Sequence, residues 1–176
     1  MRIALSLLAL ASIAAAPLAA QDMGMDHKEP PADIKPLHDQ YLGWVVTAAE
    51  QTPDAEYAFK PTPEVRSIGQ IFGHVANSNY MFCSGAKGEK DPNTTDYEKG
   101  TKAEIVAGLK AAVAYCAGVY EWANAHPHDE RTFFGQKGSV TWVLAFNLAH
   151  NSEHYGNVVT YMRLKGHVPP SSQGGM

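Results

Sequence analysis

The sequence has little cysteine, no excess of positive charge and no glycine-rich phosphate loop. Among 176 residues there are two cysteines, and 14 Lys and Arg stand against 18 Asp and Glu, which gives a net charge of −4. Affinity for nucleic acid depends on clustered Lys and Arg, so we expect no nucleic-acid partner. Nor does the chain contain a Gly-x-Ser-x-Gly elbow or a CxxC pair, which excludes two common catalytic motifs.

The first twenty residues carry almost no charge. Arg2 is followed by the apolar run 3–10, and small residues continue to Ala20. This order is typical of a secretory signal peptide. A single-pass membrane anchor is the alternative, but Pro17 and the alanine-rich end argue against stable membrane insertion. We therefore expect residues 1–20 to be a signal peptide and the protein to be periplasmic or secreted.

Polar segments with prolines lie on both sides of the central part of the chain. Residues 21–32 lack an apolar period and are interpreted as a flexible leader, and residues 169–176 as a disordered tail. In the leader, Met23, Met25 and His27 are residue types that suit copper, although a solvated tail without metal is the simpler interpretation. The folded domain is thus expected over residues 33–168.

The central part shows helical spacing of apolar residues and no competing period-two strand pattern. Thr62, followed by Pro63, is expected to cap the second helix. Four amphipathic helices bury their apolar faces by bundling, and the long connection after the second helix permits a crossover that makes helices two and three parallel. The sequence predicts an all-α four-helix bundle with this crossover. The four helices are expected over about residues 33–50, 62–83, 101–123 and 139–166.

The two cysteines fall in the second and third predicted helices. Cys83 and Cys116 both lie in the C-terminal half of their helix. Parallel helices would place them at similar heights, and an exported protein meets an oxidising compartment, so both features favour a disulfide. Two buried free thiols are the alternative that the sequence leaves open.

The most informative pattern is a histidine pair in the fourth predicted helix. His150 and His154 are four residues apart, so their imidazoles project from the same face and can reach one metal ion. His74, on an inward stripe of the second helix, supplies a third imidazole. Three protein ligands leave a coordination position open, as in catalytic zinc sites, and neutral imidazoles favour Zn²⁺, Ni²⁺ or Cu²⁺ over Mg²⁺ or Ca²⁺. The alternative is that the three histidines only pack and hydrogen-bond in the core.

Further polar residues are candidates for orienting these ligands or lining a pocket. Glu153 points roughly 100° away from the ligand face, because it directly precedes His154, and this argues against a role as general base. The cluster His126, His128 and Asp129 is interpreted as an exposed loop rather than a second metal site. The candidates for an orienting or pocket role are Asn77, Asn147, Asn157 and His38.

The stretch from His150 to Pro170, which begins His-Asn-Ser-Glu-His-Tyr-Gly-Asn, resembles the last helix of DinB-like proteins. Residues 66–74, Arg-Ser-Ile-Gly-Gln-Ile-Phe-Gly-His, are similar to their second helix, and the preceding Tyr57-x-Phe-x-Pro-Thr-Pro fits the entry into it. The likeness covers roughly residues 34–170. It implies a bundle of the DinB/YfiT-like type with a metal triad on His74, His150 and His154. It also implies a homodimer and, as in some members, metal activation of a small thiol for transfer.

Two functional hypotheses follow from these features. The first is an exported metal-dependent enzyme, a transferase or hydrolase that acts on a small-molecule substrate, with zinc or nickel as its cofactor. The alternative is a non-catalytic periplasmic metal-binding protein for storage, sensing or scaffolding, to which the Met/His leader could contribute.

Overall fold

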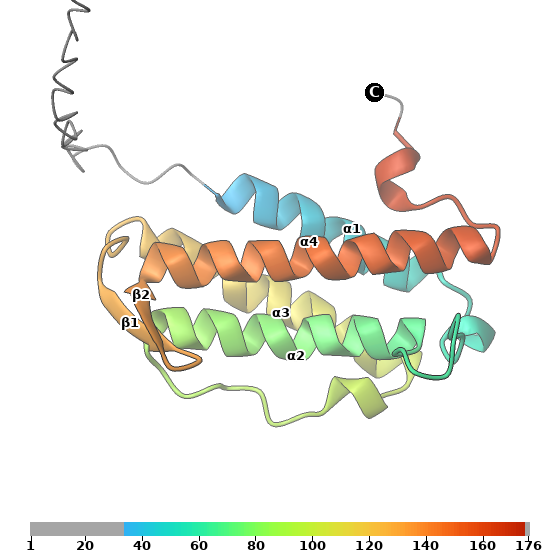
Figure 1. Ribbon diagram of the computed structural model, residues 1–176, viewed down its shortest axis with the longest axis horizontal. Helices are drawn as coiled ribbons and strands as arrows, with labels where there is room; N and C mark the ends of the chain where they lie inside the picture. The colour runs from blue at the N-terminus through green and yellow to red at the C-terminus, as the bar shows by residue number, and fades with distance from the viewer. Residues whose placement is uncertain (1–33, 175–176) are drawn as a thin grey trace, which may run out of the picture.

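The computed structural model describes residues 34–174, so the predicted signal peptide and the leader with Met23, Met25 and His27 lie outside the described residues. Four long helices run along the same axis (Figure 1). Together they confirm the predicted four-helix bundle. Their bounds are α1 Lys35–Gln51, α2 Ile68–Lys87, α3 Lys102–Ala123 and α4 Val140–Leu164, and shorter elements are η1 Asp54–Glu56, β1 Glu130–Phe133, β2 Gln136–Ser139, η2 Tyr97–Lys99 and η3 Pro170–Ser172.

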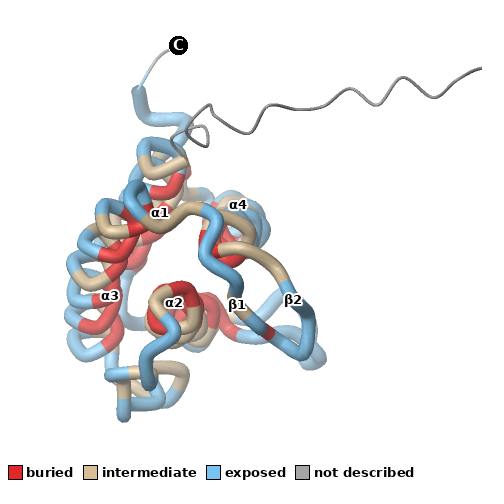
Figure 2. The backbone as a smooth tube through the Cα atoms, turned by 90° about the vertical axis from the view of Figure 1, so that its left-hand side faces the viewer, coloured by how far each residue is buried: buried red, intermediate tan, exposed pale blue. Residues whose placement is uncertain are grey.

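The helices turn their buried faces toward a common core (Figure 2). Both α1 and α2 pack against α3 and α4 and hardly touch each other, so they occupy opposite corners of the bundle. One half of the core is built around Leu42, Phe72 and Val158, and the other around Phe82, Val119 and Leu144. Burial of these apolar side chains is the main force that holds the four helices together.

The connection between α2 and α3 returns along the length of α2 (Figure 1). Tyr97 in this connection lies so close to Gly73, in the first half of α2, that a Cβ at Gly73 would overlap the Tyr97 backbone. Cys83 and Cys116, toward the other ends of α2 and α3, form a disulfide with a Cα–Cα distance of 5.6 Å. The two helices are therefore parallel, as the long crossover predicts.

The second helix begins later than predicted, because Ser67 rather than Thr62 caps it. The Ser67 hydroxyl accepts a hydrogen bond from Gln70 N, and the Gln70 side chain accepts one from Ser67 N, which completes a capping box. Before it the chain doubles back, so Ile68 N donates to the carbonyl of Phe59. Residues 60–66 consequently form an exposed segment beside the start of α2.

A β-hairpin replaces part of the loop predicted between the third and fourth helices. β1 and β2 pair antiparallel, and Phe134 and Gly135 form the turn with φ values of 49° and 75°. A turn of this kind normally has Asn, Asp or Gly at its first position, so Phe134 before Gly135 gives no clear sequence signal for it. Phe133 is buried against Phe82, whereas Phe134 is exposed.

The C-terminal segment, for which composition predicts disorder from Pro169, is folded as far as Gly174. Pro169 is buried, and Ser171 N donates to the Tyr155 hydroxyl at 2.9 Å. The side-chain amides of Gln173 and Gln51 bond to each other, which ties this segment to the end of α1. Hydrogen bonds to α4 and to α1 thus order a segment with few apolar residues.

Helix α3 is long and apolar enough, by length and composition, to cross a membrane. One such helix is weak evidence for a membrane span, because a core helix passes the same test. In this fold Ile105, Leu109 and Cys116 of α3 are buried in the bundle.

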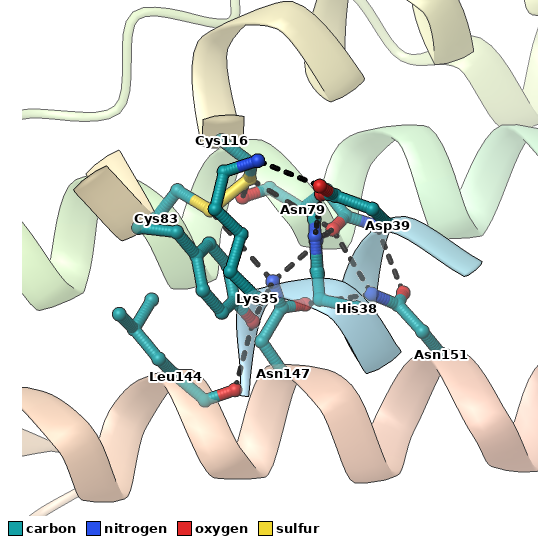
Figure 3. Close-up of polar contacts among 10 residues, drawn as sticks. Lys35, His38, Asp39, Asn79, Cys83, Cys116, Leu144, Asn147 and Asn151 are labelled. Atoms are coloured by element: carbon teal, nitrogen blue, oxygen red, sulfur yellow. Dashed lines mark hydrogen bonds and ion pairs between the residues drawn. A yellow bond between two sulfur atoms is a disulfide. The ribbon is translucent and has the colours of Figure 1, made fainter. Parts of the chain in front are cut away.

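A network of buried polar side chains joins α1, α2 and α4 inside the bundle (Figure 3). Asn79 is fully buried and exchanges two amide hydrogen bonds with Asn151, at 2.9 and 3.1 Å. Its Oδ1 also accepts from Asn147 at 3.1 Å and lies 3.3 Å from His38 Nε2. Because a buried amide without partners costs about 1–3 kcal/mol, these paired groups fix the register of α2 against α4.

His38 should make the protein less stable in mild acid. Burial lowers the pKa of His38 despite its hydrogen bonds to Asp39 and Asn79 and the nearby charge of Asp39. Below about pH 6.5 the imidazole of His38 takes up a proton in the unfolded chain but not in the folded chain. The folded state therefore keeps its full stability above this pH and loses part of it as the pH falls further. Each proton taken up only on unfolding contributes a slope of about 1.4 kcal/mol per pH unit.

Urea unfolding at about pH 7.5 and about pH 5.5 measures this effect. The variant His38→Gln, which keeps a partner for Asn79, should lose less stability between the two pH values than the wild type. An identical pH dependence in both proteins would contradict the role of His38.

Candidate metal site

Three imidazoles from two helices converge on one point. His74 comes from α2, and His150 and His154 come from successive turns of α4. Nε2 of His150 lies 3.2 Å from Nε2 of His74 and 3.1 Å from Nε2 of His154. One nitrogen from each ring falls within 4.8 Å of the others, so the three residues could hold a single metal ion.

The environment keeps two of the three rings neutral. Burial, then the neighbouring His154 and His74, and finally Arg66 lower the pKa of His150 to about 3. Burial and the nearby His74 also lower the pKa of His154. A neutral imidazole has a free lone pair, which is the form that ligates metals, so these rings are ready to bind at neutral pH.

Two of the three nitrogen–nitrogen distances fit a divalent transition metal. Two nitrogens bonded to one ion at 2.0–2.1 Å, with angles between octahedral and tetrahedral, lie about 2.9–3.4 Å apart. The two Nε2–Nε2 distances given above, 3.2 and 3.1 Å, fall in this range. The Ser78 hydroxyl oxygen, 3.4 Å from His74 Nε2, borders the same point. Imidazole donors of this number suit Zn²⁺ or Ni²⁺.

The opposite ring nitrogens of the two α4 histidines lack a partner within the described chain. Nδ1 of His150 and Nδ1 of His154 are buried and, within residues 34–174, have no hydrogen-bond partner. A buried unpaired polar group costs about 1–3 kcal/mol. When Nε2 of a ring binds a metal, Nδ1 carries the proton, so these two rings lack the hydrogen-bonded support that His74 has.

His74 differs from the other two because a carboxylate holds its second nitrogen. Glu98 Oε1 lies 2.9 Å from His74 Nδ1, and Arg66 Nε donates to Glu98 Oε2 at 3.1 Å. A carboxylate on Nδ1 places the proton there and directs the Nε2 lone pair to the metal point, which is the usual support for a metal-binding histidine. Glu98 therefore orients the His74 ring with Nε2 toward the shared point.

The connection that carries Glu98 is itself held against α2. Asn77 Oδ1 accepts hydrogen bonds from Asn93 Nδ2 at 3.2 Å and from Tyr97 N at 3.3 Å. Gly73, which has no side chain, allows the backbone of Tyr97 and Glu98 to approach the helix. A small residue and an amide on α2 thus place a distant carboxylate next to His74.

Removing the Glu98 carboxylate should weaken metal binding. We expect Glu98→Ala to lower the affinity for zinc by about 10- to 100-fold, because His74 loses the group that sets its tautomer and orientation. Glu98→Gln, which keeps an acceptor oxygen, should lose less. Competition against a chromophoric chelator measures both affinities. Glu64→Gln, at an exposed carboxylate with no contact to the histidines, is the matched control, and equal affinities in all four proteins would contradict the role of Glu98.

The polar residues predicted to surround the histidines lie in three different places. Asn77 supports the Glu98 connection, whereas Asn147 and His38 belong to the buried network around Asn79. Asn157 lines a cavity beside His154. Within residues 34–174, none of these four side chains forms a hydrogen bond with His74, His150 or His154. Their effect on the site is therefore indirect.

A cavity of about 600 Å³ adjoins the trio, with His154 in its wall. Its other walls come from the 60–66 segment, the first turn of α2 and the second half of α4. Sequence reasoning missed Arg66 and Glu98, because their roles depend on where the connecting segments fold. Glu153, which spacing directs away from the ligand face, is exposed and lines this cavity rather than the metal point.

Comparison with known proteins agrees with the fold. The family model of the DinB superfamily matches residues 44–158. The crystal structure of a DinB-like protein from Bacillus cereus ATCC 10987 superposes with a TM-score of 0.67 at 16% identity, covering 81% of this chain and 97% of that one. A DinB-like protein from Bacillus subtilis gives a TM-score of 0.62 at 18% identity, covering 80% of this chain and 99% of that one. No curated protein matches the sequence.

Proposed function

Because this chain belongs to the DinB superfamily, we propose that it binds a divalent transition metal through His74, His150 and His154. The observation that carries the proposal is the convergence of three Nε2 atoms, two pairs of them 3.1–3.2 Å apart. Zinc and nickel are the proposed ions, since both accept three imidazoles. Glu98 would hold His74, and the bundle would hold the other two rings.

We further propose that the protein is a metal-dependent enzyme, a transferase or hydrolase with a small-molecule substrate. The cavity beside His154 supports this, because it gives a small molecule access to the ligand trio. A divalent ion there would supply Lewis acidity and lower the pKa of a coordinated water or thiol. The residues of the chain would bind and orient the substrate: the exposed amide of Asn157 and the guanidinium of Arg66 both line this cavity.

Export to the periplasm or beyond is part of the proposal. The Cys83–Cys116 disulfide supports it, since disulfides persist in oxidising compartments and are rare in the cytosol. Both cysteines are fully buried, so the bond belongs to the folded core rather than to an exposed redox centre.

Elemental analysis of the purified protein after dialysis, followed by activity assays with and without added zinc or nickel, tests the proposed function. One equivalent of metal per chain and metal-dependent turnover of a chromogenic ester, amide or thiol-acceptor substrate is the expected result. Stoichiometric metal without turnover of any substrate class would favour the alternative, a non-catalytic metal-binding protein. Absence of bound metal under saturating conditions would overturn both.

A further inference from the structure

Arg66 occupies a special position in the wall of the cavity beside the histidine trio. It directly precedes the N-cap of α2, and its backbone carbonyl accepts a hydrogen bond from the Tyr161 hydroxyl of α4 at 3.1 Å. Its Nε donates to Glu98, the carboxylate that also contacts His74. Contacts at both ends therefore hold this arginine in place next to the proposed metal ligands.

The outer edge of the Arg66 guanidinium remains available. Its side chain is 45% exposed, and the described residues offer no partner to its two terminal nitrogens. Arginine binds carboxylates through two parallel N–H···O bonds, and a guanidinium that is already positioned loses little entropy in doing so. The free edge of Arg66 is thus a positioned pair of donors on a residue that lines the cavity.

The charge balance of the cavity depends on the metal. Its walls carry two positive and two negative side chains, whose charges cancel: Lys60, Arg66, Glu64 and Glu153. Three neutral imidazoles leave the charge of a bound divalent ion uncompensated, so the loaded cavity becomes positive. The carboxylates of Glu64 and Glu153 would repel a dianion such as a phosphate monoester. A small molecule with a single carboxylate carries less charge, and the two terminal nitrogens of Arg66 suffice to bind it.

We propose that this cavity binds a small substrate bearing one carboxylate, which Arg66 holds while another donor atom of the same molecule reaches the metal point. Lys60 is the second cation available to the carboxylate. The inference rests on the proposed metal site and adds the substrate class. It makes Arg66 a specificity-determining residue, linked through Glu98 to the ligand His74.

Three matched pairs of chelating probes test the proposal in the protein loaded with Co²⁺, whose visible absorption bands report ligand binding. Succinic, glutaric and adipic monohydroxamates carry a metal-binding group and a carboxylate at increasing separation. Each is compared with the analogue that has a primary amide in place of the carboxylate. Titrations are made on the wild type, Arg66→Gln, Arg66→Lys and Lys137→Gln, the last removing a surface charge on the hairpin. Co²⁺ affinity is measured for every variant, so that probes are compared at full loading.

For at least one chain length, the wild type and Lys137→Gln should bind the carboxylate about tenfold more tightly than the amide. The preference should disappear in Arg66→Gln and return in part in Arg66→Lys. Equal binding of acid and amide to the cobalt-loaded wild type would overturn the substrate class while leaving the metal site intact, and so would a preference that survives in Arg66→Gln. Absence of the cobalt bands would overturn the proposed function and this inference together.

Discussion

Replacing His154 by alanine should abolish tight metal binding and leave the bundle folded. The ring supplies one of three converging nitrogens, and its removal should lower zinc affinity by more than about 100-fold, a larger loss than removal of a supporting group causes. Folding should be little affected, because Nδ1 of His154 has no partner within the described chain and its Nε2 contacts only another member of the trio. Isothermal titration with zinc and far-ultraviolet circular dichroism measure the two effects.

His128→Ala is the control for unspecific binding by histidine. His128 is exposed in the segment between α3 and β1, away from the trio, so its loss should leave zinc affinity unchanged. If His154→Ala binds zinc as tightly as His128→Ala, the trio is not the metal site. In that case the three rings serve only to pack α2 against α4.

Loss of the Cys83–Cys116 disulfide should produce the largest change in stability. The bond closes a loop of 33 residues, and the loop-closure model gives a contribution of about 3–4 kcal/mol for this length. Both sulfurs lie in the core beside the Asn79 network, where Cys116 Sγ is 3.2 Å from the carbonyl of Asn79. The free energy of unfolding in urea should therefore fall by this amount when either cysteine is replaced by alanine.

A double-mutant cycle separates the bond from simple packing. If the disulfide is the source of the stability, Cys83→Ala, Cys116→Ala and the double variant should lose nearly the same free energy, since either change alone breaks the bond. Additive losses in the double variant would show that the cysteines contribute independently as buried side chains, and would contradict a bonded pair.

The parts of the fold that could be predicted are those fixed by helical periodicity. The third and fourth helices lie close to their predicted ranges, 101–123 and 139–166; Thr101 caps α3, Ser139 caps α4, and Gly166 follows the C-cap of α4 with φ 79°. The spacing of His150 and His154 required no tertiary information, because residues four apart share a face of any helix. The inward stripe of His74 then sufficed to bring the third ring to the same point.

The missing parts depend on contacts between segments distant in the sequence. Glu98 lies in an irregular connection, and only the approach of its backbone to Gly73 brings its carboxylate to His74. Thr62 followed by Pro63 is a strong local start signal, yet the reciprocal Ser67–Gln70 bonds cap the helix. The hairpin could not be predicted from the sequence, because its strands have four residues each and its turn contains Phe134.

X-ray absorption at the zinc edge of the protein loaded with one equivalent tests the central claim most directly. The structure predicts three imidazole nitrogens at about 2.0–2.1 Å and at least one further light atom that the protein does not supply. A spectrum with fewer than two imidazoles, or with sulfur at about 2.3 Å, would contradict a metal site formed by His74, His150 and His154.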